Sequence, residues 1–239
     1  MSKAKLQKTN HQNTIWLHGD WRQHYQGLTD HSVALLLTDP PYGINYQSHR
    51  RKKLHGPILG DSSLEGATKE LSEMLIAFKP KLKANAHLLI FCGWQNEPCI
   101  REVITDAGFR VKGVIVWVKN NHGAGDLKGA FAPKHEWIIH AVKGKPLLSH
   151  RIANVICAVK VSPDLHPTRK PVDLLMKLIE ATTGPGDLVV DPFGGVATTL
   201  LAARNGGRRS WGCEIEARYF LAGKKLLKQS SLIGWTGQP

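Results

Sequence analysis

The sequence predicts an α/β fold built on a mostly parallel, doubly wound sheet. Short apolar runs that suit strands alternate with stretches of helical periodicity along most of the 239 residues, which is typical of parallel strands joined by crossover helices. The runs at residues 33–38 and 188–191 are apolar at nearly every position, as expected of strands buried on both faces. Because a chain of this length can bury a substantial core and shows no repeat or linker, we expect one domain over residues 1–239.

The individual elements follow from the same patterns. The expected strands cover residues 14–17, 33–38, 86–92, 111–118, 136–141, 188–191 and 210–214. Helical periodicity is clearest at residues 65–81, 171–182 and 216–228, and Pro171 suits a first helical turn. Residues 43–63, rich in His, Arg and Lys, and residues 120–133, with glycines among polar residues, break the alternation. We expect both segments to be loops beside a site.

The chain is strongly basic. Lys and Arg number 32 against 19 Asp and Glu, which gives a formal net charge of +13. Such an excess favours a polyanionic partner, because cations that neutralise phosphates release counterions. A ribosome-associated or membrane-surface protein would show the same excess, so the charge alone does not identify the partner.

Cysteine usage indicates a reducing compartment. Cys92, Cys99, Cys157 and Cys213 are widely spaced and form no C-x-x-C pair, which argues against a zinc cage or a disulfide framework. Residues 1–13 are polar and basic, and no run reaches the ~18 apolar residues of a membrane span. We expect a cytoplasmic protein with neither a metal site nor a membrane segment.

A carboxylate follows the apolar run at residues 33–38, in the segment Asp39-Pro40-Pro41-Tyr42. Ligands bind at the carboxyl ends of the strands in such sheets. The prolines hold the backbone extended without competing N–H donors, so Asp39 and the Pro40 carbonyl can both accept hydrogen bonds from one amino group. The exocyclic amino nitrogen of a nucleobase is a poor nucleophile, because its lone pair is conjugated into the ring. Two hydrogen-bond acceptors can draw this nitrogen toward tetrahedral geometry. Tyr42 would stack on a base flipped out of the duplex.

A second candidate half-site begins at Asp191, after the run at residues 188–191. Phe193, Gly194 and Gly195 form a glycine turn before an expected helix, whose free N–H groups can receive a carboxylate. Glu214 ends the next strand, where an acidic residue can meet ribose hydroxyls. An ordinary strand-helix turn would look similar, so this pattern is specific only together with the first.

Four ordered motifs resemble the N6-adenine/N4-cytosine DNA methyltransferases in their beta arrangement, in which the catalytic motif precedes the cofactor motif. They are Asp39-Pro40-Pro41-Tyr42, His166-Pro167-Thr168-Arg169-Lys170-Pro171, Asp191-Pro192-Phe193-Gly194-Gly195 and Gly212-Cys213-Glu214. The resemblance implies a Rossmann-like S-adenosylmethionine-dependent methyltransferase acting on double-stranded DNA, in the cytoplasm and at the nucleoid of a bacterial or phage-infected cell. It leaves open whether the protein is a monomer or a homodimer and whether it serves restriction-modification.

The resemblance also implies roles for residues of the cofactor site. Phe193, Gly194, Gly195 and Glu214 line S-adenosylmethionine, with Asp191 nearby. Thr168 and Lys170 lie against its methionine end, and Gly19-Asp20 is similar to the segment near its adenine.

This chain departs from the family where a third glycine usually stands, because that position is Ala197. A helix-start alanine is conformationally harmless, but a requirement for a left-handed backbone there would weaken cofactor binding. Asp39, rather than Ser, at the first motif position favours adenine N6 as the target. Cytosine N4 and a non-catalytic DNA-binding protein of the same fold are the alternatives.

The run His49, Arg50, Arg51, Lys52 and Lys53 follows the proposed base pocket closely. We therefore expect it to bind phosphates around the flipped nucleotide, with residues 120–134 on the opposite side.

Only the short stretch 144–165 is placed for target recognition, which favours a short or relaxed recognition sequence. Cys99 lies in a helix-like stretch, so we expect it to be structural and not a catalytic nucleophile. Residues 135–140 nearly match a zinc-protease motif but are expected to form a strand. Neither signal indicates a further activity.

Overall fold

The structure, a computed structural model, describes residues 8–11, 13–41, 63–123, 128–159 and 169–229. Its strands in chain order are β1 (Lys8–His11), β2 (Thr14–His18), β3 (Val33–Thr38), β4 (Leu82–Cys92), β5 (Arg110–Val118), β6 (His135–Lys143), β7 (Val155–Cys157), β8 (Leu188–Asp191) and β9 (Arg209–Glu214). The helices are α1 (Leu64–Phe78), α2 (Glu97–Asp106), α3 (Val172–Thr182), α4 (Thr198–Asn205) and α5 (Ala217–Gln229), with short 3-10 helices η1 (Trp21–Gln23) and η2 (Tyr25–Gly27).

Within the described ranges the strands form a nine-stranded sheet in the order β1-β2-β9-β8-β3-β4-β6-β5-β7. Neighbours from β2 to β4 are parallel, whereas β6 runs antiparallel to both β4 and β5. The predicted mostly parallel α/β sheet is therefore confirmed. This topology puts the ends of β3, β4, β5, β8 and β9 at one edge of the sheet, together with the start of β6. We call this the carboxyl edge.

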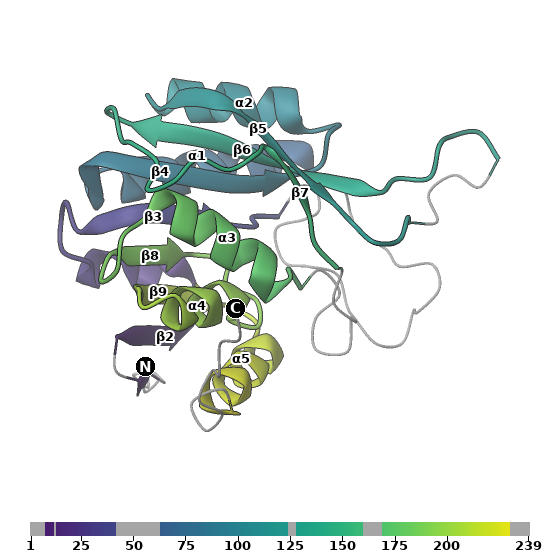
Figure 1. The fold of residues 1–239 in the computed structure, drawn as a ribbon. Helices are drawn as coiled ribbons and strands as arrows, with labels where there is room; N and C mark the ends of the chain where they lie inside the picture. The colour runs from purple at the N-terminus through teal and green to yellow at the C-terminus, as the bar shows by residue number, and fades with distance from the viewer. Residues whose placement is uncertain (1–7, 12, 42–62, 124–127, 160–168, 230–239) are drawn as a thin grey trace.

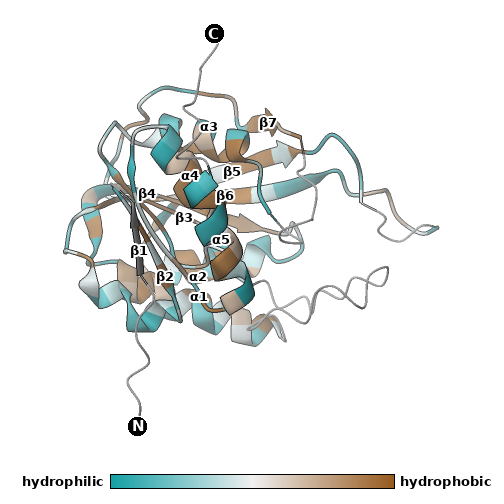
Figure 2. Cartoon of the chain, turned by 90° about the horizontal axis from the view of Figure 1, so that it is seen from below, coloured by the Kyte–Doolittle hydropathy of each residue, from teal (hydrophilic) through white to brown (hydrophobic). Residues whose placement is uncertain are grey.

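Helices cover both faces of the sheet (Figure 1). Helices α1 and α2 pack on one face over a core that includes Leu36, whereas α3 and α4 pack on the other over Leu35 and Leu37. The strand β3 is therefore apolar on consecutive residues because each face has its own core. Figure 2 shows hydrophobic residues concentrated in the central strands and hydrophilic ones on the outer turns of the helices.

A third cluster joins β2 to α4 and α5. Trp16 is fully buried there against Phe220 and Leu200, and its indole Nε1 donates a hydrogen bond to the Phe220 carbonyl at 3.0 Å. This cluster fixes the turn between β8 and α4, which carries the second half-site.

The predicted bounds were correct for β3 and β8 and close for the other strands. The strand β4 begins at Leu82 instead of residue 86, so α1 ends at Phe78 instead of residue 81. Pro171 caps α3 rather than lying in its first turn, because its ψ of 136° is extended. Two strands, β1 and β7, were not predicted. Residues 135–140 lie on β6 and Cys99 lies on α2, as expected.

Two absences concern the described residues alone. In that part of the chain, no helix is long and apolar enough to cross a membrane. The same residues contain no group of three or more His, Cys, Asp or Glu side chains placed to hold a metal ion.

Candidate active site

The two half-sites predicted from the sequence meet at the carboxyl edge, because β3 and β8 are neighbours. Leu36 pairs with Val190 in the parallel register, so Thr38 and Asp191 end adjacent strands. The Thr38 hydroxyl donates a hydrogen bond to Asp191 Oδ1 at 2.8 Å. Asp39 and Asp191 therefore border one site, although 151 positions lie between them in the chain.

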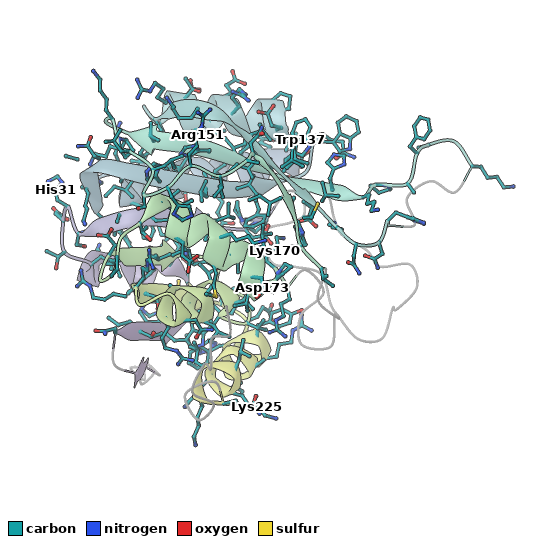
Figure 3. The ribbon with its side chains drawn as sticks, viewed as in Figure 1. His31, Trp137, Arg151, Lys170, Asp173 and Lys225 are labelled. Carbon is teal, nitrogen blue, oxygen red and sulfur yellow. The ribbon has the colours of Figure 1, made fainter. Side chains whose placement is uncertain are left out.

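Asp39 follows β3 directly and is half-buried, with Pro40 buried behind it. Its Oδ2 lies 2.5 Å from Lys170 Nζ, and Lys170 is only 6% exposed. Burial raises the pKa of Asp39, while the Lys170 charge opposes that rise. Figure 3 places Lys170 at the end of α3 that faces the carboxyl edge.

Lys170 contacts a second carboxylate, that of Glu136 near the start of β6. The distance from Lys170 Nζ to Glu136 Oε2 is 3.2 Å, and Lys119, just after β5, lies 2.6 Å from Glu136 Oε1. Although burial favours the neutral acid, the charges of Lys170 and Lys119 lower the pKa of Glu136 to about 2. Lys119, Glu136, Lys170 and Asp39 thus alternate in sign, and we call them the four-charge chain.

Neither Glu136 nor Lys119 was expected at the site from the sequence. A signal was present, because both are charged residues at strand ends that an antiparallel β6 brings to the carboxyl edge. Their pairing depends on the position of β6 between β4 and β5, which the sequence pattern did not give. For Lys170, the resemblance implies a place at the methionine end of the cofactor, whereas the structure pairs it with Asp39 and Glu136.

The turn after β8 is held by Asp191. Its Oδ1 accepts hydrogen bonds from the Thr38 hydroxyl and from the Phe193 backbone N–H at 3.2 Å. Burial raises the pKa of Asp191 to about 6, against the opposing effect of hydrogen bonds from Thr199, Thr38 and Phe193. Asp191 therefore shapes the glycine turn as well as facing the site.

The glycine turn itself is tightly packed. A Cβ on Gly194 would lie 2.6 Å from Trp16 Cζ3 and 3.2 Å from the Cys213 carbonyl oxygen, so only glycine fits. Gly195 adopts a φ of +55°, in the left-handed region.

Ala197 adopts the left-handed backbone that the sequence had left as an open condition. Its φ is 62° and its ψ is 28° at the N-cap of α4. This backbone costs a residue with a Cβ about 1 kcal/mol. The methyl group offsets part of that cost because it is fully buried in the cluster around Trp16.

Glu214, at the end of β9, closes the far side of the glycine turn. Its Oε2 accepts a hydrogen bond from the Gly195 N–H at 2.9 Å and its Oε1 accepts one from the Glu216 N–H at 2.8 Å. Burial raises the pKa of Glu214 to about 7, although both hydrogen bonds lower it. The Gly19 N–H donates to the Glu214 carbonyl, which brings Gly19 and Asp20 beside this acid.

Asp20 has a structural partner in the described chain. Its Oδ1 accepts the Arg22 N–H at 2.8 Å as the cap of η1, and Arg22 Nη1 lies 3.1 Å from Asp20 Oδ2. Arg22 also pairs with Glu70 and Glu73 of α1. The loop that carries Asp20 is therefore fixed against α1.

Some predicted site residues lie outside the described residues. They are Tyr42, His49, Arg50, Arg51, Lys52, Lys53 and Thr168, together with positions 43–62 and 124–127 of the two expected loops.

The geometry can be compared with known proteins. The DNA methylase family of N6 and N4 methyltransferases matches residues 33–161 and 149–225, a span that includes Asp39, Asp191 and Glu214. The chain belongs to this family. The resemblance inferred from the four motifs is confirmed, and the protein is a DNA methyltransferase of the N6/N4 family, whose members use S-adenosylmethionine.

Individual relatives of this methyltransferase agree with the family match. YubD of Escherichia coli (strain K12), described as a methylase, is 32% identical over 197 residues, which are 82% of this chain and 82% of that protein. The crystal structure of the M1.HpyAVI–SAM complex has a TM-score of 0.70 at 28% identity and covers 90% of this chain and 98% of its own. PvuII DNA methyltransferase, which is cytosine-N4-specific, has a TM-score of 0.73 at 18% identity, covers 96% of this chain and 89% of its own, and shows the shared fold.

Proposed function

We propose that this methyltransferase transfers the methyl group of S-adenosylmethionine to the exocyclic N6 of adenine in double-stranded DNA. One observation carries the proposal: the Thr38–Asp191 hydrogen bond joins the end of β3, with Asp39, to the glycine turn of the candidate cofactor site. An acceptor for an amino group and a turn suited to a nucleoside are therefore neighbours at the carboxyl edge.

The residues at the glycine turn fit S-adenosylmethionine in their chemistry. Each oxygen of Glu214 accepts one backbone N–H, which leaves lone pairs for the ribose hydroxyls. Phe193, Gly194 and Gly195 would line the cofactor beside Asp191, with Asp20 near its adenine and Thr168 and Lys170 toward its methionine end. When bound, S-adenosylmethionine supplies an electrophilic methyl group on a sulfonium.

Asp39 and the Pro40 carbonyl would orient the target amino group. Each accepts one N–H, so the nitrogen lone pair is free to form the bond to the methyl carbon. The ionised Asp39 carboxylate can then take the proton that the methylated nitrogen must lose. Pro41 keeps the segment extended, and Tyr42 would stack on the flipped base.

The choice of base rests on Asp39. An aspartate at the first motif position, where N4-cytosine enzymes more often carry serine, favours adenine. We further propose that residues 1–239 form one methyltransferase domain and that His49, Arg50, Arg51, Lys52 and Lys53 contact phosphates around the flipped nucleotide.

The test is to incubate the protein with labelled S-adenosylmethionine and unmethylated duplex DNA and to identify the methylated nucleoside. We expect N6-methyladenine from the wild type and at least a ~100-fold lower rate from Asp39→Ala, because one of two amino acceptors is lost. Cofactor affinity in Asp39→Ala should stay within about threefold of the wild type. Formation of N4-methylcytosine would show that the target is cytosine N4 instead of adenine N6. DNA binding without a methylated product would favour the non-catalytic alternative.

A further inference from the structure

The four-charge chain presents a difficulty for the proposed function, on which this inference rests. Lys170 Nζ lies 2.5 Å from Asp39 Oδ2, so the ammonium shares the carboxylate that is proposed to accept the target amino group. Lone pairs remain for an arriving base, but the ammonium neutralises charge that would strengthen the new hydrogen bond. The difficulty is severe because Lys170 is buried, where charged hydrogen bonds are strong.

Glu136 offers Lys170 an alternative partner. Its Oε2 is already 3.2 Å from Lys170 Nζ, and its other oxygen is held by Lys119 at 2.6 Å. The Lys170 ammonium also lies over the Phe91 ring, 4.9 Å from its centroid. Lys170 is therefore placed between two carboxylates and can strengthen one contact as it weakens the other.

We propose that Glu136, held by Lys119, is a positioning residue for methyl transfer that receives the Lys170 ammonium when the target amino group binds Asp39. Lys170 favours the ionised form of Asp39 before the base arrives, and Glu136 takes up the ammonium as the base binds. The four-charge chain has no net charge, since it contains two ammonium groups and two carboxylates.

The other three groups of the four-charge chain act on Asp39 in opposite directions. Glu136 disfavours the ionised form of Asp39, whereas Lys119 and Lys170 favour it. Two further groups face Asp39, namely Asp191 at the end of β8 and Cys92 at the end of β4. Neither is changed by substitutions in Glu136 or Lys119, so these two residues can be tested against a constant background.

The test measures single-turnover methyl transfer against pH, with saturating DNA and cofactor, in Glu136→Gln and Lys119→Met. Glu136→Gln should slow transfer about tenfold or more, because Asp39 becomes the carboxylate that retains Lys170. The acidic limb of the pH–rate profile of Glu136→Gln should move to lower pH by about one unit. The same limb of Lys119→Met should move to higher pH by a similar amount. A structural role alone would not move the limbs in opposite directions.

Two controls make the result specific. Glu102→Gln removes the same charge from an exposed position on α2 and should keep the wild-type rate and profile. Glu136→Asp retains the charge and should keep the acidic limb within about 0.3 units of the wild type, with a partial loss of rate. If Glu136→Gln does not fold, the upward shift in Lys119→Met carries the test.

The wild type could be active while the acidic limbs of Glu136→Gln and Lys119→Met stay at the wild-type pH or move in the same direction. That result would overturn this inference and leave the proposed function intact. A wild-type protein that forms no methylated base would overturn both.

Discussion

Gly194 shows how one residue can hold the cofactor turn in place. The nearest atoms to an added Cβ belong to Trp16, whose ring cannot retreat because it is fully buried and hydrogen-bonded to the Phe220 carbonyl. Gly194→Ala should lower the free energy of unfolding by about 1–3 kcal/mol, measured by urea denaturation. Gly27→Ala is the matched control, since no atom lies within 4 Å of its added Cβ. Equal stability of the two variants would contradict this packing.

Glu214 should make cofactor binding depend on pH. Its pKa is raised to about 7 by burial, so a growing fraction becomes protonated below pH 7 and loses acceptor capacity for the ribose hydroxyls. The affinity for S-adenosylmethionine should fall about tenfold between pH 8 and pH 6, as measured by calorimetry. Glu214→Gln should bind more weakly at pH 8 and lack this dependence.

Glu216→Gln removes a neighbouring carboxylate and should retain the wild-type pH dependence of cofactor binding. Persistence of the dependence in Glu214→Gln would refute the role of this acid.

At the residue scale, the sequence placed three acids at the carboxyl edge but did not give their partners. Asp39, Asp191 and Glu214 each end a strand, and a residue at a strand end can be placed at the sheet edge by pattern alone. The pairing of Lys170 with Glu136 depends on three-dimensional distances between segments far apart in the chain. Whether Ala197 takes a left-handed backbone was left open by the sequence, because alanine gives no sign of a positive φ.

At the scale of elements, β4 and β6 share a histidine pair, of which His87 is buried and His140 partly exposed. His87 Nδ1 and His140 Nε2 lie 3.0 Å apart, and His87 Nε2 lies 3.2 Å from the Leu147 carbonyl oxygen. If His87 Nε2 donates to that carbonyl, its Nδ1 accepts from His140 Nε2, so the His87 ring is neutral in this arrangement. Burial, then the charges of His87 and Lys112, lower the pKa of His140 to about 4.

This pair should make the protein sensitive to acid. Because the folded pKa of His140 lies below its unfolded value of 6.5, its contribution to stability is present above pH 6.5 and is lost as the pH falls toward 4. Lowering the pH from 7.5 to 5 should cost about 1–2 kcal/mol from this group after allowance for its partial exposure. His140→Gln keeps an N–H donor without a titrating ring, so its urea midpoint should fall less over that range. An equal fall in both proteins would count against the pair.

The strands that the sequence missed have a common physical cause. The strand β1 is the polar sequence KTNH and, among the described residues, pairs with β2 alone, while β7 has three residues and pairs with β5. Such short edge strands take their structure from a neighbour rather than from their own apolar pattern. The strands β3 and β8 were predicted to the residue because both of their faces are buried.

At the scale of the whole molecule, the net charge of +13 leads to a prediction about DNA binding. Each phosphate contact made by a cation contributes about 0.9 to the slope of log K against log salt concentration. If Arg50, Arg51, Lys52 and Lys53 grip phosphates, replacing all four with Ala should reduce that slope by about 3–4. The slope is measured by fluorescence anisotropy with a labelled duplex over a series of NaCl concentrations.

The control removes the same charge elsewhere. Lys112 and Lys145 lie at the edge of the sheet opposite the carboxyl edge, and Lys224 and Lys225 lie on α5, with all four exposed; Figure 3 shows Lys225 far from Lys170. Replacing these four with Ala should change the slope by less than about 1, because long-range attraction without phosphate contact is screened within ~10 Å at 0.1 M salt. If both quadruple variants lowered the slope equally, the basic charge would act as a general field, and the run at residues 49–53 would have no special place at the DNA.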